Sequence, residues 1–164
     1  MTSYAIIKFR YLIIALFIIL TTGCSGVSHQ TVFSKVNKNL MQDYNPFIYK
    51  LNSENDEFAT YSAEAAGEVS QSIVFNSQVL AKDIFSYFQK LCSFTEDQLV
   101  ETRLVSVDAP LFVEVWGFND PKSEREDKRS YLSLVMKQLP NDGGVDFFSK
   151  GSCHSKPTII HHPK

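Results

Sequence analysis

The chain has 164 residues, a length that fits a single domain. Its formal net charge is −2, which argues against binding to nucleic acid or to a membrane surface through clustered basic residues. Thirteen Phe and seven Tyr supply enough large apolar side chains for a domain that folds on its own. We therefore expect one small globular domain and no nucleic-acid partner.

The N-terminal segment has the three parts of an export signal. Met1–Arg10 contains two basic residues and no acidic one, Tyr11–Leu20 is wholly apolar, and small residues precede Cys24. This order is typical of a secretory signal peptide. The apolar stretch is too short for a transmembrane helix, which needs about 20 such residues. We predict that residues 1–23 are removed on export.

The residues at the predicted cleavage site are Leu20-Thr21-Thr22-Gly23-Cys24, and they resemble the lipobox of bacterial lipoproteins. The resemblance implies that Cys24 becomes the N-terminal residue and carries a diacylglyceryl group and an acyl chain. It also implies a lipid-anchored protein of the cell envelope. Ser25 after the cysteine implies the outer membrane, facing the periplasm. An ordinary signal peptidase, which would cut the same bond without lipidation, is the alternative.

The chain contains three cysteines, and export would place them in an oxidising compartment. If Cys24 carries lipid, Cys92 and Cys153 remain and can pair, which leaves no odd thiol. We predict this disulfide, and two free buried thiols are the alternative. Neither cysteine belongs to a C-x-x-C unit, which argues against a zinc site. We expect no cofactor apart from the lipid on Cys24.

The chain divides into four expected parts: the cleaved signal at 1–23, a lipidated tether at 24–31, one domain at 32–153, and a C-terminal tail at 154–164. The tail is interpreted as loop-like apart from Ile159 and Ile160. His161 and His162 lie in it without the i,i+4 spacing of helical metal ligands, so no metal site is expected.

The first elements of the domain are a short helix and a hairpin. Thr31–Tyr44 has apolar residues at near-helical spacing, and Pro46 would end this helix. Phe47–Leu51 and Phe58–Ser62 flank turn residues and indicate a β-hairpin. Ser72–Phe75 is interpreted as a short strand.

The clearest helix spans 77–92 and has one apolar stripe. The stripe consists of Leu80, Ala81, Ile84, Phe85, Phe88, Leu91 and Cys92. Asn76 or Ser77 can cap the N-terminus of the helix. Four predicted strands follow, at 99–107, 111–118, 131–139 and 145–149. The predicted fold is therefore α+β, with this helix packed on an antiparallel sheet and joined to it by the disulfide.

Alternation along 111–118 and 131–139 predicts two sheet faces. The face expected to pack on the helix contains Leu111, Val113, Val115, Leu132, Leu134 and Met136. The other is a candidate partner-binding face and contains Phe112, Glu114, Trp116, Phe118, Tyr131 and Lys137. In the alternative, which we favour, the N-terminal segment covers this second face through Phe33, Leu40 and Phe47, because large aromatic side chains are usually buried.

Motifs for catalysis are missing from the sequence, which has no G-x-S-x-G and no free cysteine if Cys92 is paired. The charged stretch Asp120–Arg129 balances four acids with four bases and is typical of a solvated hairpin loop. We expect a non-enzymatic envelope lipoprotein that binds or scaffolds another envelope protein. One alternative is a module that binds a small apolar ligand or lipid, in a pocket lined by Phe85, Phe88 and Trp116. Another is an inhibitor or immunity-type lipoprotein with a protruding acidic loop.

Overall fold

The computed structural model describes residues 28–141 and 143–164. The predicted export signal, its cleavage site and the lipidation of Cys24 lie outside the described residues. Within the described residues, no helix has both the length and the apolar character needed to cross a bilayer.

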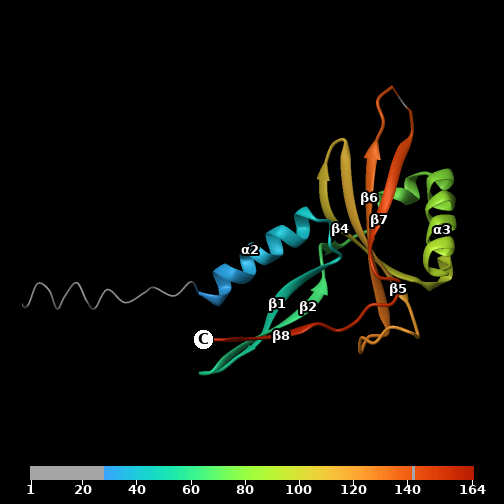
Figure 1. Ribbon diagram of the computed structural model, residues 1–164. Helices are drawn as coiled ribbons and strands as arrows, with labels where there is room; N and C mark the ends of the chain where they lie inside the picture. Colours follow the sequence, from blue (N-terminus) through green and yellow to red (C-terminus); the bar gives the residue numbers. More distant parts are fainter. Residues whose placement is uncertain (1–27, 142) are drawn as a thin grey trace, which may run out of the picture.

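The described residues form two antiparallel sheets and two α-helices, which confirms the predicted α+β fold (Figure 1). The helices are α2 (His29–Gln42) and α3 (Gln78–Cys92), with short 3₁₀ helices η1 (Ile73–Asn76) and η2 (Glu96–Gln98). The smaller sheet has the strand order β1-β2-β8, and its strands are β1 (Phe47–Glu54), β2 (Phe58–Ala65) and β8 (Ile159–Pro163). The larger sheet has the order β3-β4-β5-β6-β7, and its strands are β3 (Glu68–Val69), β4 (Leu99–Asp108), β5 (Leu111–Asn119), β6 (Arg129–Gln138) and β7 (Val145–Gly151).

Helix α2 confirms the predicted N-terminal helix but begins earlier, at His29. Ser28 caps it by accepting a hydrogen bond from the backbone N–H of Thr31. The last three residues of the expected tether therefore belong to the helix. Phe33 is buried and stacks on Tyr61 of β2 with ring centroids 3.6 Å apart, which fixes α2 against the smaller sheet.

The predicted hairpin is confirmed as β1 and β2, but the C-terminal segment is not the expected loop-like tail. Ile159–Pro163 forms β8, which pairs antiparallel with β2 from Phe58 to Ser62. A five-residue strand is stable only beside a partner. Because that partner lies about 100 residues earlier in the chain, the local sequence did not identify it.

Ser72–Phe75 is not a strand, because Ile73–Asn76 forms the 3₁₀ helix η1. The Ser72 hydroxyl accepts from the N–H of Val74, and the Glu114 carboxylate accepts from the N–H of Ile73 at 2.8 Å. A distant acidic side chain therefore satisfies the first backbone donors of this turn, in place of a neighbouring strand.

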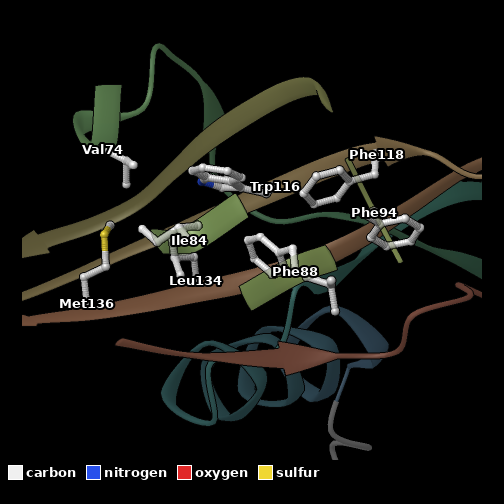
Figure 2. Close-up of a cluster of buried hydrophobic side chains, with 9 residues drawn as sticks. Val74, Ile84, Phe88, Phe94, Trp116, Phe118, Leu134 and Met136 are labelled. Carbon is white, nitrogen blue, oxygen red and sulfur yellow. The ribbon is translucent and has the colours of Figure 1, made fainter. Parts of the chain in front are cut away.

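Helix α3 packs on one face of the larger sheet and forms the main core (Figure 2). Ser77 caps its N-terminus, as predicted, and Ser93 ends it in the left-handed conformation. Ile84 and Phe88 of the predicted stripe are fully buried. Cys92 at the end of α3 is bonded to Cys153, just beyond β7, which confirms the predicted disulfide. The bond closes a loop of 61 residues and contributes about 4 kcal/mol in the chain-entropy model.

Candidate functional site

The candidate partner-binding face does not exist as one surface. In the register of β5 and β6, Phe112 is opposite Met136 and Trp116 is opposite Leu132, whereas Lys137 is opposite Leu111. Even-numbered residues of both strands therefore share one face, and Tyr131 and Lys137 lie on the other. The prediction matched even-numbered positions of β5 with odd-numbered positions of β6, and such a one-residue error reverses the face of a whole strand.

The aromatic face of β5 is covered by α3 rather than by the N-terminal segment. Trp116 and Phe118 have no exposed surface. The ring of Trp116 lies 5.4 Å from that of Phe85 and 5.6 Å from that of Phe88, measured between centroids. Figure 2 shows Trp116, Phe118 and Phe88 directed into this core. The space considered for a ligand between helix and sheet is therefore filled by these side chains.

Glu114 lies on this covered face and is buried. Its carboxylate accepts hydrogen bonds from the hydroxyl of Ser72, the N–H of Ile73 and the indole N–H of Trp116. Each donor points at the carboxylate from a different direction, so the buried acid is fully hydrogen-bonded. This arrangement fixes η1 and Trp116 relative to β5 and leaves Glu114 no exposed surface for a partner.

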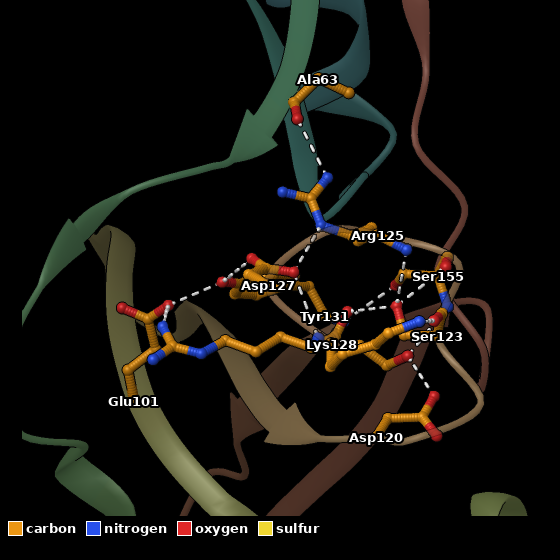
Figure 3. A network of polar contacts seen from close by, with 11 residues as sticks. Ala63, Glu101, Asp120, Ser123, Arg125, Asp127, Lys128, Tyr131 and Ser155 are labelled. Atoms are coloured by element: carbon orange, nitrogen blue, oxygen red, sulfur yellow. Dashed lines mark hydrogen bonds and ion pairs between the residues drawn. The ribbon is translucent and has the colours of Figure 1, made fainter.

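Tyr131, the aromatic residue expected on the same patch, lies on the opposite face under β1 (Figure 3). Its ring packs edge-on against Phe47, and its hydroxyl lies 2.9 Å from a carboxylate oxygen of Glu101 and 3.2 Å from one of Asp127. Burial is the main cause that raises the pKa of Tyr131 to about 12, so the phenol remains protonated between the two carboxylates. Phe47 therefore contacts Tyr131 on the other face of the sheet and does not cover the aromatic face of β5 as expected.

The charged stretch 120–129 is the loop of the β5–β6 hairpin and is largely exposed, as predicted, and some of its side chains also join the two sheets. Arg125 donates to the carbonyl of Ala63 in β2, and its guanidinium lies 5.3 Å from the ring centroid of Phe47. Ser123 is buried and donates to the carbonyl of Ser155. These contacts join β2, the loop and the C-terminal segment (Figure 3).

Asp120 anchors this junction and is itself buried. Burial opposes ionisation of its carboxyl, but hydrogen bonds from Ser130 and His154 and from the backbone N–H of Lys122 outweigh burial and lower the pKa of Asp120. The imidazole Nδ1 of His154 lies 2.9 Å from the carboxylate. Asp120 is therefore an ionised structural acceptor.

A large hollow lies elsewhere, between α2 and the two sheets, and we call it the α2 groove. Its volume is about 800 Å³. Helix α2 forms one wall with two rows of side chains spaced four residues apart: Gln30, Ser34, Lys38 and Gln42, and Phe33, Asn37 and Met41. The remaining lining comes from both sheets and from the end of α2: Tyr44, Tyr49, Leu51, Tyr61, Val105, Ser106 and Val113.

Several polar groups of the α2 groove are already hydrogen-bonded to one another. The amide of Asn37 accepts from the N–H of Tyr49 at 2.7 Å and donates to its carbonyl at 2.8 Å. The hydroxyl of Tyr61 lies 2.8 Å from Nδ1 of His29. Because these groups need no further partner, the wall they leave for a ligand is apolar and aromatic.

Lys38 is the one charged side chain in the lining of the α2 groove. It is exposed, and no carboxylate of residues 28–141 or 143–164 lies within ion-pair distance of it. Among the same residues, no group of three or more His, Cys, Asp or Glu side chains is arranged to bind a metal ion. His161 and His162, expected in a tail, are part of β8.

The α2 groove was not anticipated from the sequence. The spacing of Val32, Phe33, Val36 and Leu40 indicated a helix, but nothing local showed that one face of this helix would meet two sheets. No protein-family model, curated protein or solved structure matches the chain. Inference about function therefore depends on the chemistry of the groove itself.

Proposed function

We propose that this protein is a non-enzymatic, lipid-anchored protein of the cell envelope that binds an elongated apolar ligand in the α2 groove. The observation that carries the proposal is the groove itself, with its volume of about 800 Å³ and its aromatic and aliphatic lining. Ligand sites in proteins have volumes of about 300–1,000 Å³ and are lined mainly by apolar side chains with a few polar groups.

The length of the groove favours an elongated ligand. Gln30 and Met41 both line it and are 11 residues apart on α2, a distance of about 17 Å along the helix axis. Each leaflet of a bilayer contributes about 15 Å of hydrocarbon thickness. A single extended acyl chain therefore matches the wall formed by α2.

The expected anchor would bring the groove close to a membrane. Only four Cα–Cα steps separate Cys24 from Ser28, which together span at most about 15 Å. A lipid on Cys24 would therefore keep the start of α2 near the bilayer surface, where apolar ligands are concentrated. This step rests on the resemblance of residues 20–24 to a lipobox.

A matched pair of substitutions tests ligand binding. Leu51 lines the groove and Phe58 does not, yet both belong to the same hairpin and both are 43% exposed. In native mass spectrometry of protein purified from envelopes, we expect wild type and Phe58→Glu to retain a bound apolar ligand and Leu51→Glu to lose it. Equal occupancy in all three proteins, or no bound ligand in wild type, would contradict the proposal.

A second candidate function is the scaffolding of another envelope protein, and it is favoured by β7. This strand pairs only with β6 among the described strands, and its Phe148 is exposed. An unpaired edge can accept a strand from a partner. A photoreactive amino acid at position 148 should give one discrete crosslinked product in intact cells, and the absence of any product would exclude this edge as the binding surface.

A further inference from the structure

The chemistry of the α2 groove narrows the class of ligand it can take. Its apolar wall would favour a hydrocarbon of any kind, but Lys38 places one positive charge at that wall. Lysine packs its methylene stem on apolar surface and keeps the ammonium in water. The groove therefore combines an apolar wall, on which a hydrocarbon chain can lie, with a single cation at its rim.

We propose that the ligand is a free long-chain carboxylic acid, with its carboxylate paired to Lys38 and its chain on Met41, Tyr49 and Leu51, which line the groove and are not buried. This inference rests on the proposed function, because it names the ligand of the same groove. A carboxylate carries one negative charge, which matches the one cation of the lining. The pair would lie at the rim, where the ammonium remains hydrated and no charge has to be buried.

The single cation of the lining argues against a phosphate head group. Phosphate sites usually gather several donors, such as arginine side chains or successive backbone N–H groups. In the α2 groove, the amide of Asn37 is used by the backbone of Tyr49, and the hydroxyl of Tyr61 lies against His29. Lys38 is left as the one cationic donor, which suits a carboxylate better than a phosphate. A ligand with one acyl chain also agrees with the groove, in which α2 forms a single wall.

Photolabelling of the full-length, membrane-anchored protein in phospholipid nanodiscs tests this inference. Two probes of equal chain length are used, a diazirine-bearing fatty acid and the corresponding fatty alcohol, and the labelled peptides are mapped. We expect both probes to label the peptides that line the groove, and the acid to label them more strongly.

The decisive variant is Lys38→Gln, with Lys35→Gln as its matched control. Lys35 is exposed on the same helix but does not line the groove. We expect Lys38→Gln to reduce labelling by the acid about three- to fivefold, as for the loss of an exposed ion pair, without changing labelling by the alcohol. Lys38→Arg and Lys35→Gln should label as wild type does.

The possible outcomes separate this inference from the function on which it rests. If acid and alcohol label the groove equally, and Lys38→Gln changes neither, the groove binds apolar chains but does not select a carboxylate, and the inference is wrong. A third probe, a diazirine-bearing phospholipid, separates the remaining cases. If the phospholipid labels the groove peptides and the acid does not, the ligand is a membrane lipid, and the inference is wrong while the proposed function stands. If none of the three probes labels the groove peptides, both the inference and the proposed function are overturned.

Discussion

At the scale of single residues, burial decides the roles of the side chains on β5. Trp116 was the central residue of the candidate partner-binding face, yet it has no exposed surface and donates its indole N–H to buried Glu114 at 2.8 Å. A residue in this position contributes to stability, and a partner cannot reach it without unfolding the core.

Replacing Trp116 by Ala should therefore destabilise the protein by about 3–5 kcal/mol, the usual cost of deleting a large core aromatic. The change also removes one of the hydrogen bonds to Glu114. Urea denaturation measures the effect, and Val79→Ala on α3, where the side chain is 73% exposed, provides the control. A Trp116→Ala protein as stable as wild type would show that this core is described wrongly.

Because the pKa of Asp120 is lowered in the folded protein, the free energy of unfolding should depend on pH. The folded protein keeps this carboxylate ionised at a lower pH than the unfolded chain, in which its pKa is near 3.8. Its stabilisation is therefore complete above that pH and disappears as the pH falls through the lowered pKa of the folded state.

We expect the difference in unfolding free energy between wild type and Asp120→Asn to shrink between about pH 5 and about pH 2. The exposed Glu126, changed to Gln, should show no comparable trend. Denaturant titrations across this range provide the measurement. A difference that does not change with pH would mean that the Asp120 carboxylate is not ionised in the folded protein at the lower pH values.

At the scale of elements, β8 marks the limit of what the sequence could predict about secondary structure. The amphipathic stripe of 77–92 and the turn residues between strands are local signals, and they located α3 and strands β4 to β7 of the larger sheet, but not the short β3. The pairing of β8 with β2 and the conformation of η1 depend on partners distant in the chain, and local patterns contain no information about such partners. The same reason explains the missed groove, because both sheets contribute to its lining.

Ending the chain at Thr158 should loosen β2 while leaving the α3 core intact. The pairing of β8 with residues 58–62 would be lost, and each backbone hydrogen bond contributes about 1 kcal/mol. In hydrogen exchange, we expect faster exchange for the amides of β2 and unchanged protection for β5 and β6. Removal of Lys164 alone, which breaks its ion pair with Glu54 and one backbone hydrogen bond to Glu57 but leaves β8 in place, serves as the control. Uniform loss of protection would instead show that the two sheets unfold together.

At the scale of the whole molecule, α2 and α3 lie on opposite sides of the larger sheet and have different roles (Figure 1). Helix α3 closes the core, and the disulfide ties its end to the segment beyond β7. Helix α2 covers the smaller sheet and leaves the groove open. Helix α2 also begins a few residues after Cys24, the proposed site of the lipid anchor. The anchor and the ligand site would therefore lie at the same end of the molecule.

The proposed anchor makes a separate prediction for the N-terminus. Mass spectrometry of the protein from membranes should show that it begins at Cys24 and carries a diacylglyceryl group and an acyl chain. Cys24→Ala should abolish the modification and release the protein from the membrane fraction. An unmodified Cys24 in membrane-bound wild type would contradict lipidation and, with it, the position of the groove relative to the bilayer.

The most direct test of the central claim is an experimental structure of the protein purified from its own membranes without added ligand. We predict continuous elongated density in the α2 groove, running along Tyr49 and Leu51 and ending beside Lys38. A groove that contains only water in such a structure, or that is closed by movement of α2 onto the larger sheet, would contradict the account.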